Sequence, residues 1–258
     1  GASTPGGGLR VGVDLGTASC VLVVLASSGT MRDVPLWVES TPTAAVRDGV
    51  VVDFAAAADA VRRLRARAEE ALGVDLGGSG VRTATAYPPC IDVADARACT
   101  FVCEAGGFVD VVLVDEVSAA QQLLGVVDGV VVDVGGGSTG VGVFRGGELV
   151  ALDDRAGGGH HLDLVLAGAL GIPLEQAEEH KRTHPADSLG ILKPGLQRIA
   201  ESVRRLTVGH EELPLHLAGG ALMIPGASDV LAAYLERPTV TYPHALLITP
   251  LGIAMSAS

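Results

Sequence analysis

The stretch VVVDVGGGSTGVGVF, from Val130 to Phe144, places three consecutive glycines between two valine-rich runs. Glycine weakens a strand, and it is tolerated there where another backbone or a ligand must come close. The residues after the glycines alternate small and apolar and end at Gly146-Gly147, which is a strand period followed by a turn. The stretch therefore predicts a strand–loop–strand hairpin whose tip offers backbone N–H groups to phosphate oxygens. By itself, it also fits a plain tight hairpin.

A second stretch, VGVDLGTASCVLVVLASSG from Val11 to Gly29, follows the same plan. Placing Asp14 on Asp133 also aligns Val11 with Val130, Val13 with Val132, Gly16 with Gly135 and Val24 with Val143. Internal repeats of this kind change the fold that a sequence predicts. Two copies of one Asp–Gly–hydroxyl hairpin, one in each half of the chain, predict two like domains around a single phosphate group.

The bulk composition sets limits on the class of protein. The chain has 258 residues, 48% hydrophobic and 19% charged, so it can bury a sizeable core. Its net charge of −12 argues against nucleic acid as a partner, because that needs clustered Lys and Arg. No apolar run approaches the roughly 20 residues of a membrane span. Residues 1–9 are expected to form a flexible tail, and they lack the basic and apolar regions of a signal peptide. The four cysteines form no CxxC pair, so we expect reduced thiols and a cytoplasmic location.

The rest of the chain alternates between strand and helix patterns, which predicts an α/β fold with mixed sheets. Beyond the two hairpins, a turn and short strand are expected over 47–54, and further strands over 81–87, 109–114, 148–154, 213–218 and 239–242. The expected helices are 55–72, 92–107, 115–125, 162–170, 174–182, 191–206, 228–235 and 249–256.

Five segments in this order resemble the actin-like ATPase superfamily, which includes sugar kinases, DnaK-type chaperones and bacterial actins. DLGTAS and DVGGGSTG resemble its two phosphate loops, LAGGALMIPG its adenosine loop, and VDEVSAAQQLLG and TPLGIAMS its two interdomain helices. The resemblance covers nearly the whole chain from Val11. It implies a duplicated ribonuclease H-like βββαβαβα domain with small or minimal inserted subdomains. The expected domains are 10–126 with the C-terminal helix 247–258, and 127–246.

Four further segments are more specific. RDGVVVDF, AGGGHHLDLVLAG, AEEHKRTH and ITPLGIA resemble the ethanolamine utilization protein J family. Proteins of that family are encoded with the enzymes of bacterial microcompartments and are described as chaperones.

The resemblance implies roles for residues near the phosphates of ATP or ADP. Asp14 and Asp133 would hold Mg²⁺ through its waters, since carboxylate oxygens suit this ion. Glu116 matches the carboxylate that positions the attacking water, a role that fits a helix start near both loops. The phosphate oxygens would be held by the hydroxyls of Thr17 and Ser138 and by the N–H groups of Gly16, Gly135, Gly136 and Gly137.

The nucleoside side of the site is implied in the same way. Gly158 and Gly159 would let the chain approach the nucleotide, and Gly219 and Gly220 would admit its sugar–phosphate backbone. Glu178, Lys181 and Arg182 match an E-x-x-K-R pattern that surrounds the ribose and adenine in the chaperone relatives. Met223 stands where relatives place a side chain that contacts adenine, and a thioether suits that contact.

The sequence also departs from the family patterns. Val117 replaces the proline that usually follows the glutamate, and Ser138 replaces a threonine of the chaperones. No lysine lies between Thr17 and Tyr87, where the DnaK-type proteins carry a catalytic lysine.

Three functions follow from this resemblance. The first is a nucleotide-switched ATPase that acts as a chaperone or assembly factor for ethanolamine-utilization microcompartment enzymes. The second is a non-hydrolysing scaffold like the pilus-assembly or cell-shape relatives. The third, a small-molecule kinase, is disfavoured because no segment resembles a substrate-base insertion. A protein client is expected and a membrane is not, and the oligomeric state stays open.

Some patterns suggest chemistry but have a simpler structural explanation. His160 and His161 follow glycines, and His180 and His184 are spaced one helical turn apart, yet no further ligands complete a zinc pattern. We interpret them as surface or capping histidines. Cys99 and Cys103 are expected to be buried small residues rather than redox groups. Finally, core packing is the expected role of Leu162, Leu166 and Leu170.

Overall fold

A computed structural model of the chain describes residues 8–27 and 33–258. Its contacts divide the chain into two compact units: unit 1 is Gly1–Leu124 with Thr249–Ser258, and unit 2 is Gly125–Ile248. Most of the predicted tail, 1–9, lies outside the described residues. The prediction was wrong for its last residue, because Leu9 is buried and begins the first strand.

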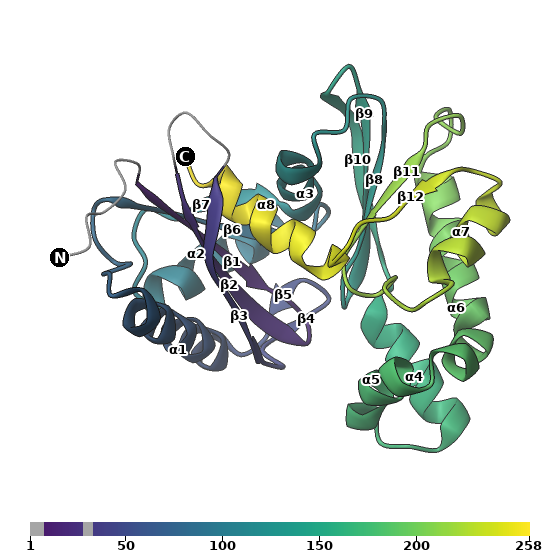
Figure 1. The fold of residues 1–258 in the computed structure, drawn as a ribbon, viewed down its shortest axis with the longest axis horizontal. Coiled ribbons are helices and arrows are strands. Elements are labelled where there is room, and N and C mark those ends of the chain that lie inside the picture. Colours follow the sequence, from purple (N-terminus) through teal and green to yellow (C-terminus); the bar gives the residue numbers. More distant parts are fainter. Residues whose placement is uncertain (1–7, 28–32) are drawn as a thin grey trace. The chain divides into compact units, whose positions relative to one another are not determined.

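Unit 1 contains a five-stranded sheet in the order β3-β2-β1-β6-β7 (Figure 1). Strands β1, β6 and β7 run parallel, while β2 and β3 are antiparallel additions to one side. The strands are β1 Leu9–Leu15, β2 Ser19–Ala26, β3 Val34–Pro42, β6 Val81–Tyr87 and β7 Val112–Asp115, with a small hairpin of β4 Val46–Arg47 and β5 Val50–Val51. The helices are α1 Phe54–Leu72, α2 Val93–Ala105, α3 Glu116–Leu124 and the C-terminal α8 Ile248–Ser256.

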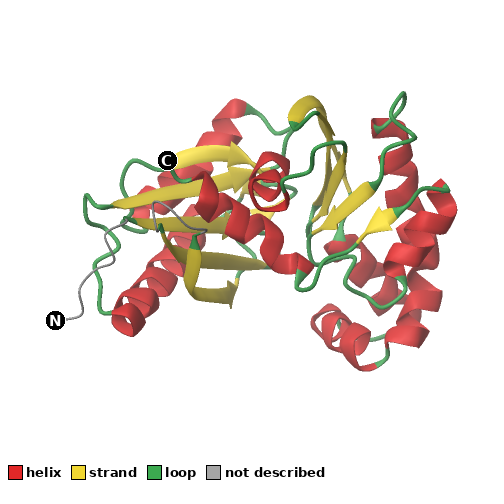
Figure 2. Ribbon diagram, turned by 45° about the horizontal axis from the view of Figure 1, so that its top comes forward, coloured by secondary structure: helices red, strands yellow, loops and turns green. Residues whose placement is uncertain are grey.

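Unit 2 repeats this topology, with the strand order β10-β9-β8-β11-β12 (Figure 2). Its strands are β8 Gly129–Val134, β9 Ser138–Arg145, β10 Glu148–Ala156, β11 Leu215–Ala218 and β12 Thr239–Val240. Its helices are α4 Gly159–Leu170, α5 Leu174–Thr183, α6 Pro185–Leu206 and α7 Ala227–Leu235, with the short η1 Ala245–Leu247. The two sheets match strand for strand, which is the duplicated α/β arrangement that the twin hairpins predict.

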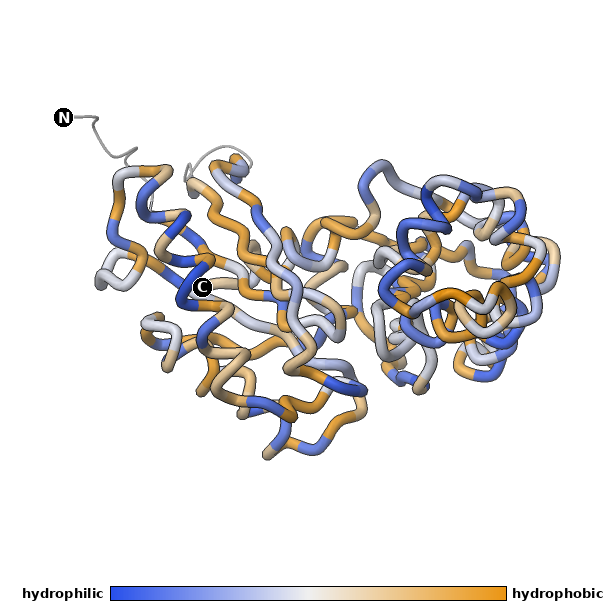
Figure 3. Tube along the Cα trace, turned by 90° about the horizontal axis from the view of Figure 1, so that it is seen from below, coloured by the Kyte–Doolittle hydropathy of each residue, from blue (hydrophilic) through white to orange (hydrophobic). Residues whose placement is uncertain are grey.

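The helices follow from local sequence signals. Asp53 caps α1 by accepting a hydrogen bond from the Ala56 N–H at 2.9 Å, and Gly73 ends it in a left-handed conformation. Apolar residues at helical spacing, such as Val61 and Leu64, are completely buried. Along the helices of both units, apolar and hydrophilic residues alternate (Figure 3).

The core of unit 1 has a layer on each face of its sheet. Residues of α1 and α2 pack against Val11, Val13 and Leu22 on one face. On the other face, α8 packs so closely against both β1 and α3 that each of these contacts requires a glycine. A Cβ on Gly12 would lie 2.5 Å from the Ala254 nitrogen, and one on Gly252 would lie 1.8 Å from the Ala119 carbonyl oxygen.

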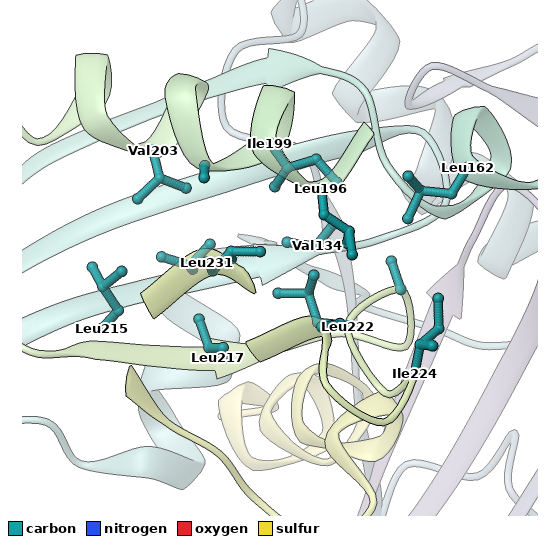
Figure 4. Packing of buried hydrophobic residues seen from close by; sticks show 14 of the residues in the cluster. Val134, Leu162, Leu196, Ile199, Val203, Leu215, Leu217, Leu222, Ile224 and Leu231 are labelled. Atoms are coloured by element: carbon teal, nitrogen blue, oxygen red, sulfur yellow. The ribbon is translucent and has the colours of Figure 1, made fainter. Parts of the chain in front are cut away.

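The core of unit 2 lies between its sheet and the helices α4, α6 and α7 (Figure 4). Val134 on β8 and Leu215 and Leu217 on β11 face the helical residues Leu196 and Leu231. These side chains are at most 3% exposed, so this layer fixes the sheet under the helices.

Some features of the fold differ from what the sequence predicted. The strand expected at 109–114 begins at Val112, and its residues are half-buried rather than buried. Strand β3 was not predicted at all. Leu162 and Leu166 are buried as expected, but Leu170 is 36% exposed at the end of α4. Among the described residues, no helix combines the length and hydropathy needed to cross a membrane.

We predict opposite effects for alanine at two helical glycines. Gly252→Ala should lower the free energy of unfolding by about 3 kcal/mol or more, because its methyl group would overlap the Ala119 carbonyl. Gly168→Ala on α4 meets nothing within 4 Å and should raise it by about 0.5–1 kcal/mol. Urea unfolding followed by circular dichroism measures both. Equal stabilities would mean that α8 does not pack on α3 as described.

Candidate functional site

The two glycine loops are closed by the same pair of backbone hydrogen bonds. In unit 1, the Gly16 N–H donates to the Ser19 carbonyl at 3.0 Å, and the Thr43 N–H donates to the Ala18 carbonyl at 3.1 Å. The equivalent bonds of unit 2 run from Gly135 to Ser138 at 3.1 Å and from Gly157 to Gly137 at 3.0 Å. The strand registers agree as well, because Val11 pairs with Val24 and Val130 pairs with Val143. The twin hairpins are therefore one structural unit used twice.

The loop of unit 2 is held in addition by the first turn of α4. The N–H groups of Gly159 and His160 donate to the carbonyls of Gly135 and Gly136 at 2.8 and 2.9 Å. In a trans peptide the C=O and the following N–H point in opposite directions. The N–H groups of Gly136 and Gly137 therefore point away from α4, and they donate to no group among the described residues. Such a pair of outward N–H groups can bind an anion.

The turn that holds this loop has no room for side chains. A Cβ on Gly158 would lie 2.3 Å from the Gly135 carbonyl oxygen, while Gly159 is buried beside Ala221. His161 completes the turn, since its Nδ1 accepts a hydrogen bond from the Gly158 N–H at 3.3 Å. This is the capping role expected for that histidine.

Asp133 is the second-to-last residue of β8, just before the glycine loop, and is only 5% exposed. Its register neighbour on the parallel strand β11 is Ala218, and Gly219 follows with a φ of +88°. A Cβ on Gly219 would lie 2.6 Å from Asp133 Oδ1 and 2.3 Å from the Val134 carbonyl oxygen. Gly219 is therefore required by packing within the protein, whatever ligand is bound.

The next residues leave more space for a ligand. Gly220 is exposed, and a Cβ there would meet only the Leu246 Cβ, at 3.5 Å. Met223 is 44% exposed. Together with Gly219, Tyr242 and Ala245, it lines a cavity of about 330 Å³. A thioether at the rim of such a cavity is available to a flat apolar group.

Unit 1 brings its acidic residues to one edge of its sheet. Because β1, β6 and β7 are parallel, Asp14 and the Asp115-Glu116 pair all lie at the carboxyl ends of strands. Asp115 accepts a hydrogen bond from the Ser118 N–H at 2.8 Å and so caps α3. Glu116, half-buried in the first turn, is not the residue that caps the helix. Thr17 lies half-buried in the loop between Gly16 and Ser19.

The carboxylates at this edge affect the pKa values of nearby buried thiols. Burial raises the pKa of Cys99 to about 12, and the nearby charges of Glu116 and Asp14 contribute to that rise. Burial and the charge of Asp14 likewise raise the pKa of Cys20 to about 12. The structure thus brings Asp14 and Glu116 near the same thiol. Cys99 and Cys103 are buried, as predicted.

The charged residues of α5 that were expected near the ribose and adenine form ion pairs within the protein. The Lys181 Nζ lies 2.6 Å from a carboxylate oxygen of Asp163 on α4 and 2.6 Å from one of Glu178. Burial by itself would lower the pKa of Lys181, but its hydrogen bonds to these two carboxylates outweigh burial and raise it. Arg182 is exposed and pairs with Glu179. The contacts of these residues therefore join α5 to α4, and Asp163 is a partner that the sequence analysis missed.

Comparisons with known proteins identify the class of protein first. No model of a known family matches the sequence. A chain of the PilM–PilN type IV pilus biogenesis complex superposes with a TM-score of 0.77 and 16% identity, covering 98% of this chain and 99% of that one. MreB5 of Spiroplasma citri bound to AMPPNP gives 0.76 and 16%, covering 95% and 94%. The chain has the actin-like ATPase fold, as predicted.

More similar proteins identify the family. Ethanolamine utilization protein EutJ of Salmonella typhimurium is 36% identical over 249 residues, 96% of this chain and 85% of that protein. EutJ of Escherichia coli is 36% identical over 250 residues, 96% and 86% of the two chains. The crystal structure of EutJ from Carboxydothermus hydrogenoformans has a TM-score of 0.88 and 37% identity, covering 98% of this chain and 91% of that one. The chain belongs to the EutJ family.

The buried thiols give a test of the carboxylate edge. A pKa of about 12 leaves a thiolate fraction on the order of 10⁻⁴ at pH 8, so Cys20 and Cys99 should react slowly with a chromogenic disulfide reagent. We expect the exposed Cys90 to react rapidly in the folded protein and all four thiols to react in guanidinium chloride. Rapid reaction of Cys99 in the folded protein would contradict the described packing under Glu116.

Proposed function

We propose that the chain binds an adenine nucleotide with Mg²⁺ and uses it as a switch in the assembly or folding of ethanolamine-utilization microcompartment enzymes. The main support for this proposal is the glycine loop that occurs in both units, each time with an aspartate near the end of the preceding strand. In unit 2, the N–H groups of Gly136 and Gly137 in this loop point outward. The actin-like fold and the AMPPNP-bound structure of one neighbour support a nucleotide as the ligand. Membership of the EutJ family supports the ethanolamine context.

The donor groups fit the proposed ligand. Asp14 and Asp133 supply carboxylate oxygens, which are the ligands that Mg²⁺ prefers, directly or through its waters. The bound ion would neutralise charge on the phosphates. The hydroxyls of Thr17 and Ser138 and the loop N–H groups would donate to phosphate oxygens, and Met223 would contact the base.

Glu116 is the residue on which hydrolysis would depend. Its neighbour Asp115 already caps α3. The Glu116 carboxylate is half-buried in the first helical turn, at the same edge as Asp14. We propose that it accepts a hydrogen bond from the attacking water and orients it.

A nucleotide-binding scaffold without hydrolysis is the second candidate. Lys181 and Lys193 are the only lysines of the sequence. Lys181 is paired with two carboxylates on the helices α4 and α5, and no lysine lies between Thr17 and Tyr87. A lysine like the catalytic one of the DnaK-type proteins is therefore lacking, which favours slow turnover or none.

Nucleotide binding is tested by thermal unfolding. At a concentration of 100 times Kd, MgADP should stabilise the protein by about 2.7 kcal/mol and raise its Tm. Gly220→Val should abolish this shift, because its side chain would occupy the space proposed for the nucleotide. The position is exposed and tolerates a Cβ in the ligand-free protein, so the fold should be kept. Gly190→Val on α6, which meets nothing within 4 Å, is the matched control and should keep the shift. An unchanged Tm of the parent protein with MgADP would refute the proposed ligand.

The role of Glu116 is tested by single-turnover hydrolysis beside calorimetric ATP binding. Glu116→Gln keeps the volume and removes the charge, so turnover should fall by roughly 10²–10⁴-fold with little change in ATP affinity. Glu104→Gln, an exposed change on α2, should leave both unchanged. If the parent protein shows no hydrolysis above background, the scaffold candidate replaces the ATPase.

The proposed switch predicts a nucleotide-dependent partner. The amount of a purified ethanolamine-utilization enzyme that binds the immobilised protein should differ between MgATP and MgADP. Gly220→Val should bind the same amount in both, since it is expected to lose the nucleotide. Equal binding to the parent protein in both nucleotides would exclude a switch.

A further inference from the structure

Unit 2 contains a second cavity, which shares only Gly158 with the residues expected at the nucleotide site. Its volume is about 190 Å³, and it is lined by the strand ends around Thr139 and Ala156 and by the helices α4 and α6. Gly157 and Gly158 also line it, so it adjoins the turn that holds the glycine loop. Neither the loop 135–138 nor the loop 219–223 contributes to it.

The walls of this cavity are mainly apolar. Leu162 on α4 and Ile199 on α6, at most 6% exposed, both line it. Val165, 47% exposed, lies on the same helix as Leu162 and leaves an apolar surface open at the rim. An apolar wall that is partly accessible can accept a short hydrocarbon chain.

The hydroxyl groups that line the cavity already donate hydrogen bonds within the protein. Thr139 Oγ1 donates to the Gly157 carbonyl at 2.8 Å, and Ser202 Oγ donates to the Arg198 carbonyl at 3.2 Å. His161 Nδ1 accepts from the Gly158 N–H, so the proton of its neutral ring is on Nε2, which is left as a donor.

Arg198 supplies the other donors. Its side chain lines the cavity and has no ion-pair partner among the described residues. The next acid along α6, Glu201, is paired with Arg204 and Arg205. In a chain with a net charge of −12, a guanidinium without an ion-pair partner among the described residues, in the same cavity as a donor imidazole, favours an anionic ligand.

We propose that this cavity binds a short aliphatic monocarboxylate. A carboxylate can accept two parallel hydrogen bonds from the Arg198 guanidinium and a third from His161 Nε2. The alkyl chain would cover Leu162, Val165 and Ile199. The small volume excludes drug-sized ligands, which need roughly 300 Å³ or more. The ligand would also contact Gly157 and Gly158 and so reach the turn that anchors the glycine loop.

The test is a titration of the nucleotide-free full chain with hexanoate, followed by NMR. We expect saturable shifts of the Leu162, Val165 and Ile199 methyl groups and of the Gly157 and Gly158 amides, with a Kd on the order of millimolar. Hexylamine and hexanol, which lack the carboxylate, should bind at least about tenfold more weakly. Because no nucleotide is present, failure here is distinct from failure of the proposed function.

Variants identify the recognition group. Arg198→Gln, at an exposed position, should weaken hexanoate binding by about tenfold to a hundredfold with an otherwise unchanged spectrum. Lys193→Gln, the matched loss of an exposed cation on α6 outside the cavity, should not change it. A capped glutamate, acetyl-Glu-amide, presents the same group as a protein side chain would and should bind more weakly than hexanoate. Unchanged affinity in Arg198→Gln, shifts outside the cavity, or tighter binding of the capped glutamate would overturn the proposal.

Discussion

The close approach of the α4 N-terminus to the glycine loop is the contact on which the candidate site of unit 2 depends. Two N–H groups of the first turn of α4 bind the carbonyls of Gly135 and Gly136, and this fixes the opposite orientation of the following N–H groups. The contact exists only because Gly158 has no side chain, since a Cβ would overlap the Gly135 carbonyl. The candidate anion site made of backbone N–H groups thus depends on packing and has no basic residue in its loop.

Unit 1 builds the same loop with a different support. It keeps the two closing hydrogen bonds, from Gly16 to Ser19 and from Thr43 to Ala18. In unit 2, the chain continues from the equivalent position directly into α4. In unit 1 the sheet is instead stabilised on its far face by α8, where Gly12 allows the helix backbone to come close. Duplication preserved the hairpin, while each unit has its own second layer of contacts.

The sequence predicted the features that depend on local pattern and internal repetition. Aligning Asp14 with Asp133 matched Val11 with Val130 and Val24 with Val143, and the structure pairs Val11 with Val24 just as it pairs Val130 with Val143. The fold class was also predicted, because five motifs occur in one order, and the family was predicted from four further segments. Strand β3 was missed since its residues Val34 and Leu36 are exposed and Pro35 interrupts the pattern, as an edge strand allows.

Features that depend on contacts between distant segments were not predictable. One partner of Lys181 is Asp163 on another helix, and no spacing rule connects these two residues. The space beside Gly219 is occupied by Asp133 and the end of β8, so a side chain there would disturb the protein itself, whatever ligand is bound. Gly220, next to it, is the position at which a side chain would test the ligand without disturbing the fold. The site residues assigned from the family resemblance otherwise stay predictions.

The acidic edge of unit 1 lies over a layer of buried thiols. Burial raises the pKa of Cys20, Cys99 and Cys103, so these thiols stay neutral and add no charge beside Asp14 and Glu116. On the proposed function, nucleotide phosphates would approach an edge that carries two carboxylates, and like charges repel. A Mg²⁺ ion bound with the nucleotide would offset this repulsion, so we expect nucleotide binding to depend on Mg²⁺.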